Sequence, residues 1–221
     1  MMVLAFGPDG VGGADQERGE GCARTALRDS RPTEHASSIM TAGTTPAEIV
    51  TFWREAGPDK WFEPDREFDL AIRSRFFAMY EAAAGGRLAA WQESREGALA
   101  LVLLLDQFPR NMFRGEARAF ATDAMARAVA DGALARGFDQ ATDSTMRPFF
   151  YLPFMHSEAL VDQDRCIGLY EALGDAEQLR YAREHRDVIK KFGRFPHRNR
   201  ALDRSTTQAE REFLDGDGVA G

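Results

Sequence analysis

The sequence has few cysteines, no long apolar run and no excess of positive charge. Only two of its 221 residues are cysteines, Cys22 and Cys166, so we expect no disulfide framework, as in a reducing compartment. The longest unbroken apolar run, residues 98–105, is far shorter than the roughly 20 residues that a membrane-spanning helix needs. The formal net charge of −7 argues against nucleic-acid binding through bulk electrostatics. These features predict a soluble, cytoplasmic protein with neither a membrane nor a nucleic-acid partner.

The first 40 residues differ in composition from the rest of the chain. They are rich in Gly, Asp, Arg, Glu and Ser and lack a sustained apolar period, which predicts a disordered leader. Directly after Met40 comes a helix start, with Thr45 as the N-cap, Pro46 at the first helical position and Glu48 at the third. Two explanations remain open: translation begins at Met40, or the leader is a genuine disordered tail. We expect one α-helical domain over residues 41–215 and a flexible tail over 216–221.

From Thr45 onward, apolar residues recur at helical spacing almost throughout. We expect helices that begin near residues 45, 68, 94, 122, 144, 175 and 206 and end near residues 57, 85, 107, 136, 173, 191 and 213. The segment 144–173 forms one or two helices with Pro148 and Pro153 inside it, and Pro109 ends the third helix. No run of alternating β-branched residues predicts a strand. The predicted fold is therefore all-α, built from antiparallel helix pairs.

Polar residues interrupt the apolar pattern at the end of the third predicted helix. Asp106 continues the apolar stripe of residues 99–103, which places its carboxylate beside the core. Such a carboxylate is costly unless it is paired, and Arg110 or Arg114 are the nearest candidates. The cluster also contains Asn111. It is either a buried ion pair that closes the helix end or part of a functional site.

Histidines mark two further polar clusters. His156 shares a helical stripe with Leu152 and Leu160, and His185 lies on a second stripe, so both are expected to face inward. Such histidines are more often hydrogen-bonded core residues than catalysts. Glu158 points to a different face from His156. The third cluster continues into residues 190–204, which carry six Lys or Arg against one Asp; it contains Arg194, His197, Arg198 and Asn199. This basic segment is either a solvated surface or an anion site, because guanidinium groups match phosphate and carboxylate geometry.

Four sequence blocks resemble the bacterial family called domain of unknown function 924: Trp53 with residues 60–62, and residues 104–111, 152–158 and 192–199. The resemblance covers roughly residues 45–214, and it would place the start of the family near Met40. It implies an α-helical fold of the tetratricopeptide-like superhelical kind and no established activity. Two positions depart from the expected pattern: Ala159 stands where an acidic residue is expected, and Asp203 where glycine is usual.

These clusters support two hypotheses about function. The first is a polar pocket for a small anionic ligand, with hydrolase or transferase activity on a phosphate or carboxylate ester if it is catalytic. Its anion-binding residues would be Arg110, Arg114, Arg194, Arg198, Asn111 and Asn199, and its catalytic residues His156, His185, His197, Asp106 and Glu158. No cofactor or metal is expected, because the spacing of these residues matches no ligand motif. The alternative is a non-catalytic tetratricopeptide-like interaction scaffold, for which Trp61, Phe62 and Trp91 would be contact residues unless they pack in the core.

Overall fold

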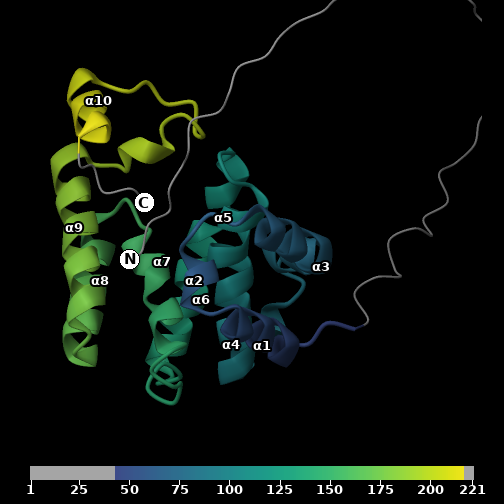
Figure 1. Ribbon diagram of the computed structural model, residues 1–221. Coiled ribbons are helices and arrows are strands. Elements are labelled where there is room, and N and C mark those ends of the chain that lie inside the picture. Colours follow the sequence, from purple (N-terminus) through teal and green to yellow (C-terminus); the bar gives the residue numbers. More distant parts are fainter. Residues whose placement is uncertain (1–42, 217–221) are drawn as a thin grey trace, which may run out of the picture.

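The computed structural model describes residues 43–216, which are helical without any β-strand (Figure 1). The all-α prediction is confirmed for this part of the chain. The predicted leader over residues 1–40 and the tail beyond Gly216 lie outside the described residues. The helices are α1 (Pro46–Ala56), α2 (Pro58–Trp61), α3 (Arg66–Ala84), α4 (Arg95–Val102), α5 (Phe108–Met112), α6 (Asp123–Ala135), α7 (Leu152–Met155), α8 (Leu160–Leu173), α9 (Ala176–Phe192) and α10 (Gln208–Asp215).

Local sequence explains where several helices begin and end. At the start of α1, the Thr45 hydroxyl accepts the Glu48 amide at 3.3 Å and the Glu48 carboxylate accepts the Thr45 amide at 2.6 Å. Asp175 caps α9 by accepting an amide hydrogen bond from its first turn. Gly193 ends α9 at a φ of 69°, a left-handed conformation in which glycine avoids the Cβ clash of other residues.

The centre of the molecule is α4, which contacts α1 and α6, while α3 packs against α5 (Figure 1). All residues of α4 from Gly97 to Val102 are buried, on every side of the helix. The antiparallel helices α8 and α9 pack along one edge, and α7 lies between this pair and α6. A second, smaller apolar cluster around Val188, Ile189 and Phe195 holds the chain that follows α9. The candidate site lies where this segment meets α7 and the end of α4.

The segment 144–173 differs from its prediction. A 3₁₀ turn over Arg147–Phe150, helix α7 and helix α8 replace the one or two long helices. His156 is the C-cap of α7 and is buried, but Leu160 is 42% exposed, so the predicted stripe through Leu152, His156 and Leu160 does not exist. The tetratricopeptide-like superhelix stays a prediction. None of the described helices is long and apolar enough to span a bilayer.

Candidate functional site

A widened helical turn brings Asp106 into the core. Residues Leu103–Gln107 form a π-helical turn in which the Phe108 amide bonds to Leu103, five residues back. Pro109 follows and has no N–H, so the carbonyl of Leu105 accepts the Thr122 hydroxyl at 2.6 Å instead of a helical amide. The helix continues through α5 to Met112, so the prediction that Pro109 ends it was wrong. Such π turns occur frequently at functional sites.

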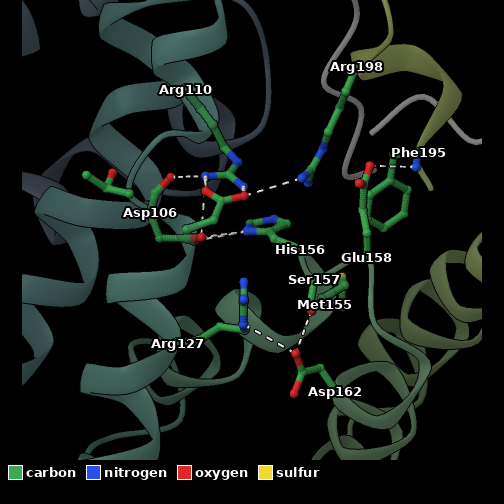
Figure 2. Close-up of polar contacts among 12 residues, drawn as sticks. Asp106, Arg110, Arg127, Met155, His156, Ser157, Glu158, Asp162, Phe195 and Arg198 are labelled. Carbon is green, nitrogen blue, oxygen red and sulfur yellow. Dashed lines mark hydrogen bonds and ion pairs between the residues drawn. The ribbon is translucent and has the colours of Figure 1, made fainter. Parts of the chain in front are cut away.

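Asp106 and His156, 50 residues apart in sequence, form a buried hydrogen-bonded pair (Figure 2). The Nδ1 atom of His156 lies 2.8 Å from Oδ1 and 3.0 Å from Oδ2 of Asp106. The side-chain amide of Gln107 donates from Nε2 to the same carboxylate at 2.5 Å, and Arg110 Nη1 lies 3.3 Å from its Oδ1 atom. Burial by itself would raise the pKa of Asp106, but Arg110, His156 and Gln107 outweigh it and hold that pKa below its ordinary value. The carboxylate is therefore ionised at neutral pH.

This pairing fixes the state of the imidazole. An ionised carboxylate accepts a hydrogen bond, so Nδ1 of His156 carries the proton and Nε2 carries a lone pair. Burial and the neighbouring charge of Arg110 lower the pKa of His156, and the opposing effect of Asp106 is smaller. The ring is therefore neutral at pH 7. Nε2 forms no hydrogen bond with any residue in 43–216, which leaves it available to a ligand or a water molecule.

Two arginines meet at Asp123, which lies in the first turn of α6. Arg110 holds this carboxylate with both terminal nitrogens, at 3.1 and 3.2 Å. Arg198 reaches it with a single contact of 3.3 Å from Nη1, and its guanidinium carbon lies 4.6 Å from the ring centroids of both Phe120 and Phe195. Figure 2 shows the side chains of Arg110, Arg198 and His156 converging from different elements.

Arg198 is the least satisfied charge of this cluster. Its side chain is 7% exposed, and its Nε atom is buried without a hydrogen-bond partner. Burial and the like charge of Arg110 lower the pKa of Arg198 to about 10. A buried cation with unused donors is expected to attract an anion, because an added negative charge would compensate its lost hydration.

The other two histidines of the described residues, His185 and His197, lie on either side of Phe195. The ring centroid of Phe195 is 5.6 Å from that of His185 and 5.4 Å from that of His197. Nδ1 of His185 donates to the Tyr181 carbonyl at 2.8 Å, so its Nε2 also carries a lone pair. Burial lowers the pKa of His185 to about 4, and burial with the charge of Arg198 takes the pKa of His197 well below its ordinary value. Both rings are neutral at physiological pH.

Asn111 and Arg114 lie at the edge of this cluster and are paired elsewhere. Arg114 donates from Nε and Nη2 to the Asp69 carboxylate at 3.0 and 2.9 Å, and Asn111 donates to it at 2.8 Å. Both residues nevertheless line a pocket of about 10 Å³ that also reaches Arg110 and His156. That volume holds roughly one water molecule.

Glu158, Arg194 and Asn199, by contrast, fasten the chain that follows α9. The Glu158 carboxylate accepts the Phe195 amide at 2.9 Å and binds both terminal nitrogens of Arg204 at 2.8 and 3.0 Å. Arg194 forms two hydrogen bonds with the buried Glu210, at 2.6 and 2.8 Å. Asn199 donates to a threonine hydroxyl in the same segment, at 3.4 Å. These contacts hold Arg198 and His197 in place.

Sequence reasoning missed the part of Asp123 in the site. Aspartate is common in the first turn of a helix, so the position of Asp123 in the sequence gave no functional signal. A second network near the site was missed as well: Ser157 donates to Asp162 at 2.5 Å, and Asp162 pairs with Arg127 at 3.3 Å (Figure 2). Within residues 43–216, no group of three or more His, Cys, Asp or Glu side chains is arranged to hold a metal ion.

The fold and the site define an all-α protein with a buried aspartate–histidine pair beside an incompletely paired arginine. Residues 49–218 match the sequence model of the family described as "Bacterial protein of unknown function (DUF924)", and the chain belongs to that family. It is similar to a solved structure described as a protein of unknown function from Agrobacterium tumefaciens. The two share 51% identity with a TM-score of 0.75, over 77% of this chain and 96% of the other. No curated protein matches the sequence.

Proposed function

We propose that the chain binds a small anionic ligand at Arg198 and that the Asp106–His156 pair moves a proton on the bound ligand. The observation that carries this proposal is the buried Nε of Arg198, which has no hydrogen-bond partner. Arg198 also makes a single hydrogen bond within the described residues, whereas Arg110 contacts both Asp106 and Asp123.

The four charges of this cluster sum to zero, so the proposal depends on the position of Arg198 and not on a net positive charge. Two carboxylates, Asp106 and Asp123, face two guanidinium groups, and Arg110 lies within 3.3 Å of both carboxylates. Arg198 shares Asp123 with Arg110, so its own charge is only partly compensated. A carboxylate or a phosphate ester fits its planar donors.

The aspartate–histidine pair supplies general acid–base chemistry. With Nδ1 held by Asp106, Nε2 of His156 accepts a proton from a water molecule as its oxygen forms a bond to the carbonyl carbon or the phosphorus of an ester. The ester oxygen then leaves and takes up that proton, which gives an acid and an alcohol. Asp106 stabilises the imidazolium between these steps. An acceptor hydroxyl in place of water makes the reaction a group transfer.

Binding is tested by thermal shift and calorimetry with inorganic phosphate, sulfate, acetate and short alkyl phosphates. We expect millimolar or tighter binding of at least one anion, and a loss of about tenfold or more in Arg198→Gln. The matched control is Arg200→Gln, which removes an exposed arginine two residues further on and is expected to leave binding unchanged. If no anion binds, or if both variants lose binding equally, the proposal is wrong.

Catalysis is tested with chromogenic phosphate and carboxylate esters. His156→Asn keeps an N–H near the position of Nδ1 but removes Nε2, so we expect it to retain anion binding and lose activity about 10²- to 10⁴-fold. An unchanged rate in His156→Asn would exclude His156 as the base.

The scaffold alternative has less support. Trp61, one of its proposed contact residues, is 7% exposed, donates from Nε1 to the Trp53 carbonyl at 2.6 Å and packs 5.0 Å from Phe149. Its indole is therefore mostly occupied by core packing.

A further inference from the structure

The candidate site is closed to a ligand of the size proposed above. Arg198 and His156 are each 5% exposed. The pocket that reaches His156 has a volume of about 10 Å³, enough for roughly one water molecule. A phosphate or carboxylate ester is several times larger than a water molecule, so part of the chain has to move before such a ligand can contact Arg198.

The segment best placed to move is the one that carries Arg198. Residues 194–207, which we call the strap, connect α9 to α10 (Figure 1). Phe195 is the one strap residue in either apolar cluster of residues 43–216, and it belongs to the smaller cluster, with Val188 and Ile189. Helices α5 and α7, which carry Arg110 and lead into His156, contribute apolar residues to the main core instead. A segment with few buried apolar contacts opens at low cost in free energy.

Contacts within the strap allow it to move as a unit. Arg194, at its start, donates to the carbonyl of Ser205, near its end, at 2.8 Å. Arg194 also binds Glu210 of α10 at 2.6 and 2.8 Å, and the Arg204 amide donates to the Asn199 carbonyl at 2.8 Å. The two ends of the strap are therefore held together, as in an Ω-loop, a class of loop that is frequently functional.

One carboxylate outside the strap holds it against the site. Glu158, between α7 and α8, accepts the Phe195 amide at 2.9 Å (Figure 2) and binds both terminal nitrogens of Arg204 at 2.8 and 3.0 Å. The side chains of Glu158 and Arg204 are 29% and 23% exposed, so water can replace this ion pair at little cost in free energy. A second contact, from Arg198 to Asp123, is long at 3.3 Å. These contacts can break while the helices stay folded.

Several polar atoms of the strap are buried and unpaired. Nε of Arg198, Oδ1 of Asn199 and Nε of Arg204 lack a hydrogen-bond partner within residues 43–216. A buried polar atom without a partner costs free energy, which water recovers when the atom becomes exposed. The closed position of the strap is destabilised by this cost, and opening is favoured.

We infer that the strap opens as a unit to expose Arg198 and that Glu158 holds it closed. Gly193, at a φ of 69° between α9 and the strap, provides the hinge, because glycine adopts left- and right-handed backbone conformations without strain. The opening is a property of the fold, whereas its use in admitting an anion rests on the proposed function. Glu158 is a positioning residue in this scheme.

Chemical modification of Arg198 tests the opening without any ligand. Butanedione reacts with exposed arginines, and mass spectrometry of the digested full chain gives the rate at Arg198. We expect this rate to be measurable without urea and nearly independent of urea below the unfolding transition, because a local opening exposes little surface. A rate that becomes measurable only as the whole chain unfolds would overturn the inference.

Variants of the ion pair test the role of Glu158. Glu158→Gln and Arg204→Gln are each expected to raise the modification rate of Arg198 about three- to tenfold. The matched control Glu171→Gln breaks an exposed ion pair with Arg183, which joins α8 to α9, and should leave the rate unchanged. An unchanged rate in Glu158→Gln, or an equal increase in the control, would refute Glu158 as the residue that holds the strap closed.

Binding kinetics separate this inference from the proposed function. If opening admits the anion, the rates at which ethyl phosphate binds and dissociates, followed by tryptophan fluorescence, should both rise about three- to tenfold in Glu158→Gln. Unchanged rates would show that the anion enters by another route, and would overturn the role of the strap in admitting it. If no anion binds, the proposed function is refuted, and the modification of Arg198 alone decides whether the strap opens.

Discussion

Replacing Arg198 with methionine is expected to stabilise the protein while it abolishes anion binding. Burial is the main cause that lowers the pKa of Arg198 from its ordinary value to about 10. One pKa unit corresponds to about 1.4 kcal/mol, so the charged guanidinium costs the folded state about 3 kcal/mol at every pH below that value. Methionine has a similar length and no charge, and so it removes this cost.

The substitution also removes favourable contacts. Arg198 packs against two aromatic rings, which contribute about 0.5–1 kcal/mol each, and it makes one 3.3 Å contact with Asp123. Asp123 remains paired, because Arg110 holds it with two hydrogen bonds. We therefore expect Arg198→Met to raise the free energy of unfolding by about 1–2 kcal/mol and the Tm by about 3–6 °C.

Arg110→Met provides the contrast. Arg110 compensates both Asp106 and Asp123, so its removal leaves two buried carboxylates short of a partner and is expected to cost about 3–5 kcal/mol. Urea unfolding followed by circular dichroism at pH 7 measures both variants, with calorimetry for anion binding. A loss of more than about 1 kcal/mol in Arg198→Met would show that Arg198 is a structural brace, and it would refute the reasoning behind the anion site.

Three further predictions concern the surroundings of the site. The pKa of about 4 for His185 means that the unfolded chain binds this proton more readily between pH 6.5 and 4, so stability falls as pH is lowered through that window. His185→Phe should remove about 3 kcal/mol of this fall, and an unchanged pH profile in urea unfolding would contradict the assignment. Thr122→Val should cost about 1–3 kcal/mol of unfolding free energy, because it leaves the Leu105 carbonyl without a donor, whereas a neutral result would mean that water replaces the hydroxyl. Glu158→Gln weakens the contacts to Arg204 and should therefore speed proteolytic cleavage within the segment that follows Gly193. Equal cleavage rates in the variant and the original protein would show that other contacts hold this segment.

Local sequence predicted most of the helical structure. Helix ends depend on residues close together in the chain, so they can be predicted without knowledge of the fold. Examples are the capping box of Thr45 and Glu48, the Asp175 cap and the glycine that ends α9. The burial of His185 also followed from the 3.6-residue period of α9.

The local sequence around Pro109 was misleading, because a proline can either end a helix or be accommodated within it. Pro109 removes one backbone donor, which ends a helix if the freed carbonyl stays unpaired. Here the Thr122 hydroxyl, from the chain just before α6, pairs with that carbonyl, so the helix continues through a π turn. Nothing near Pro109 in the sequence reveals that a hydroxyl will be available.

The partners of the charged side chains were decided only by tertiary structure. The sequence contains 28 Lys or Arg and 35 Asp or Glu, so each cation has many possible partners. The packing of α6 and α7 against the end of α4 pairs Arg110 with Asp123 and Asp106 with His156, while Arg194 finds Glu210. Local periodicity was enough to predict that Asp106 and His185 turn inward, because each lies on the apolar stripe of a continuous helical segment. Which side chains meet depends on how the helices pack against one another, and those contacts join residues far apart along the chain.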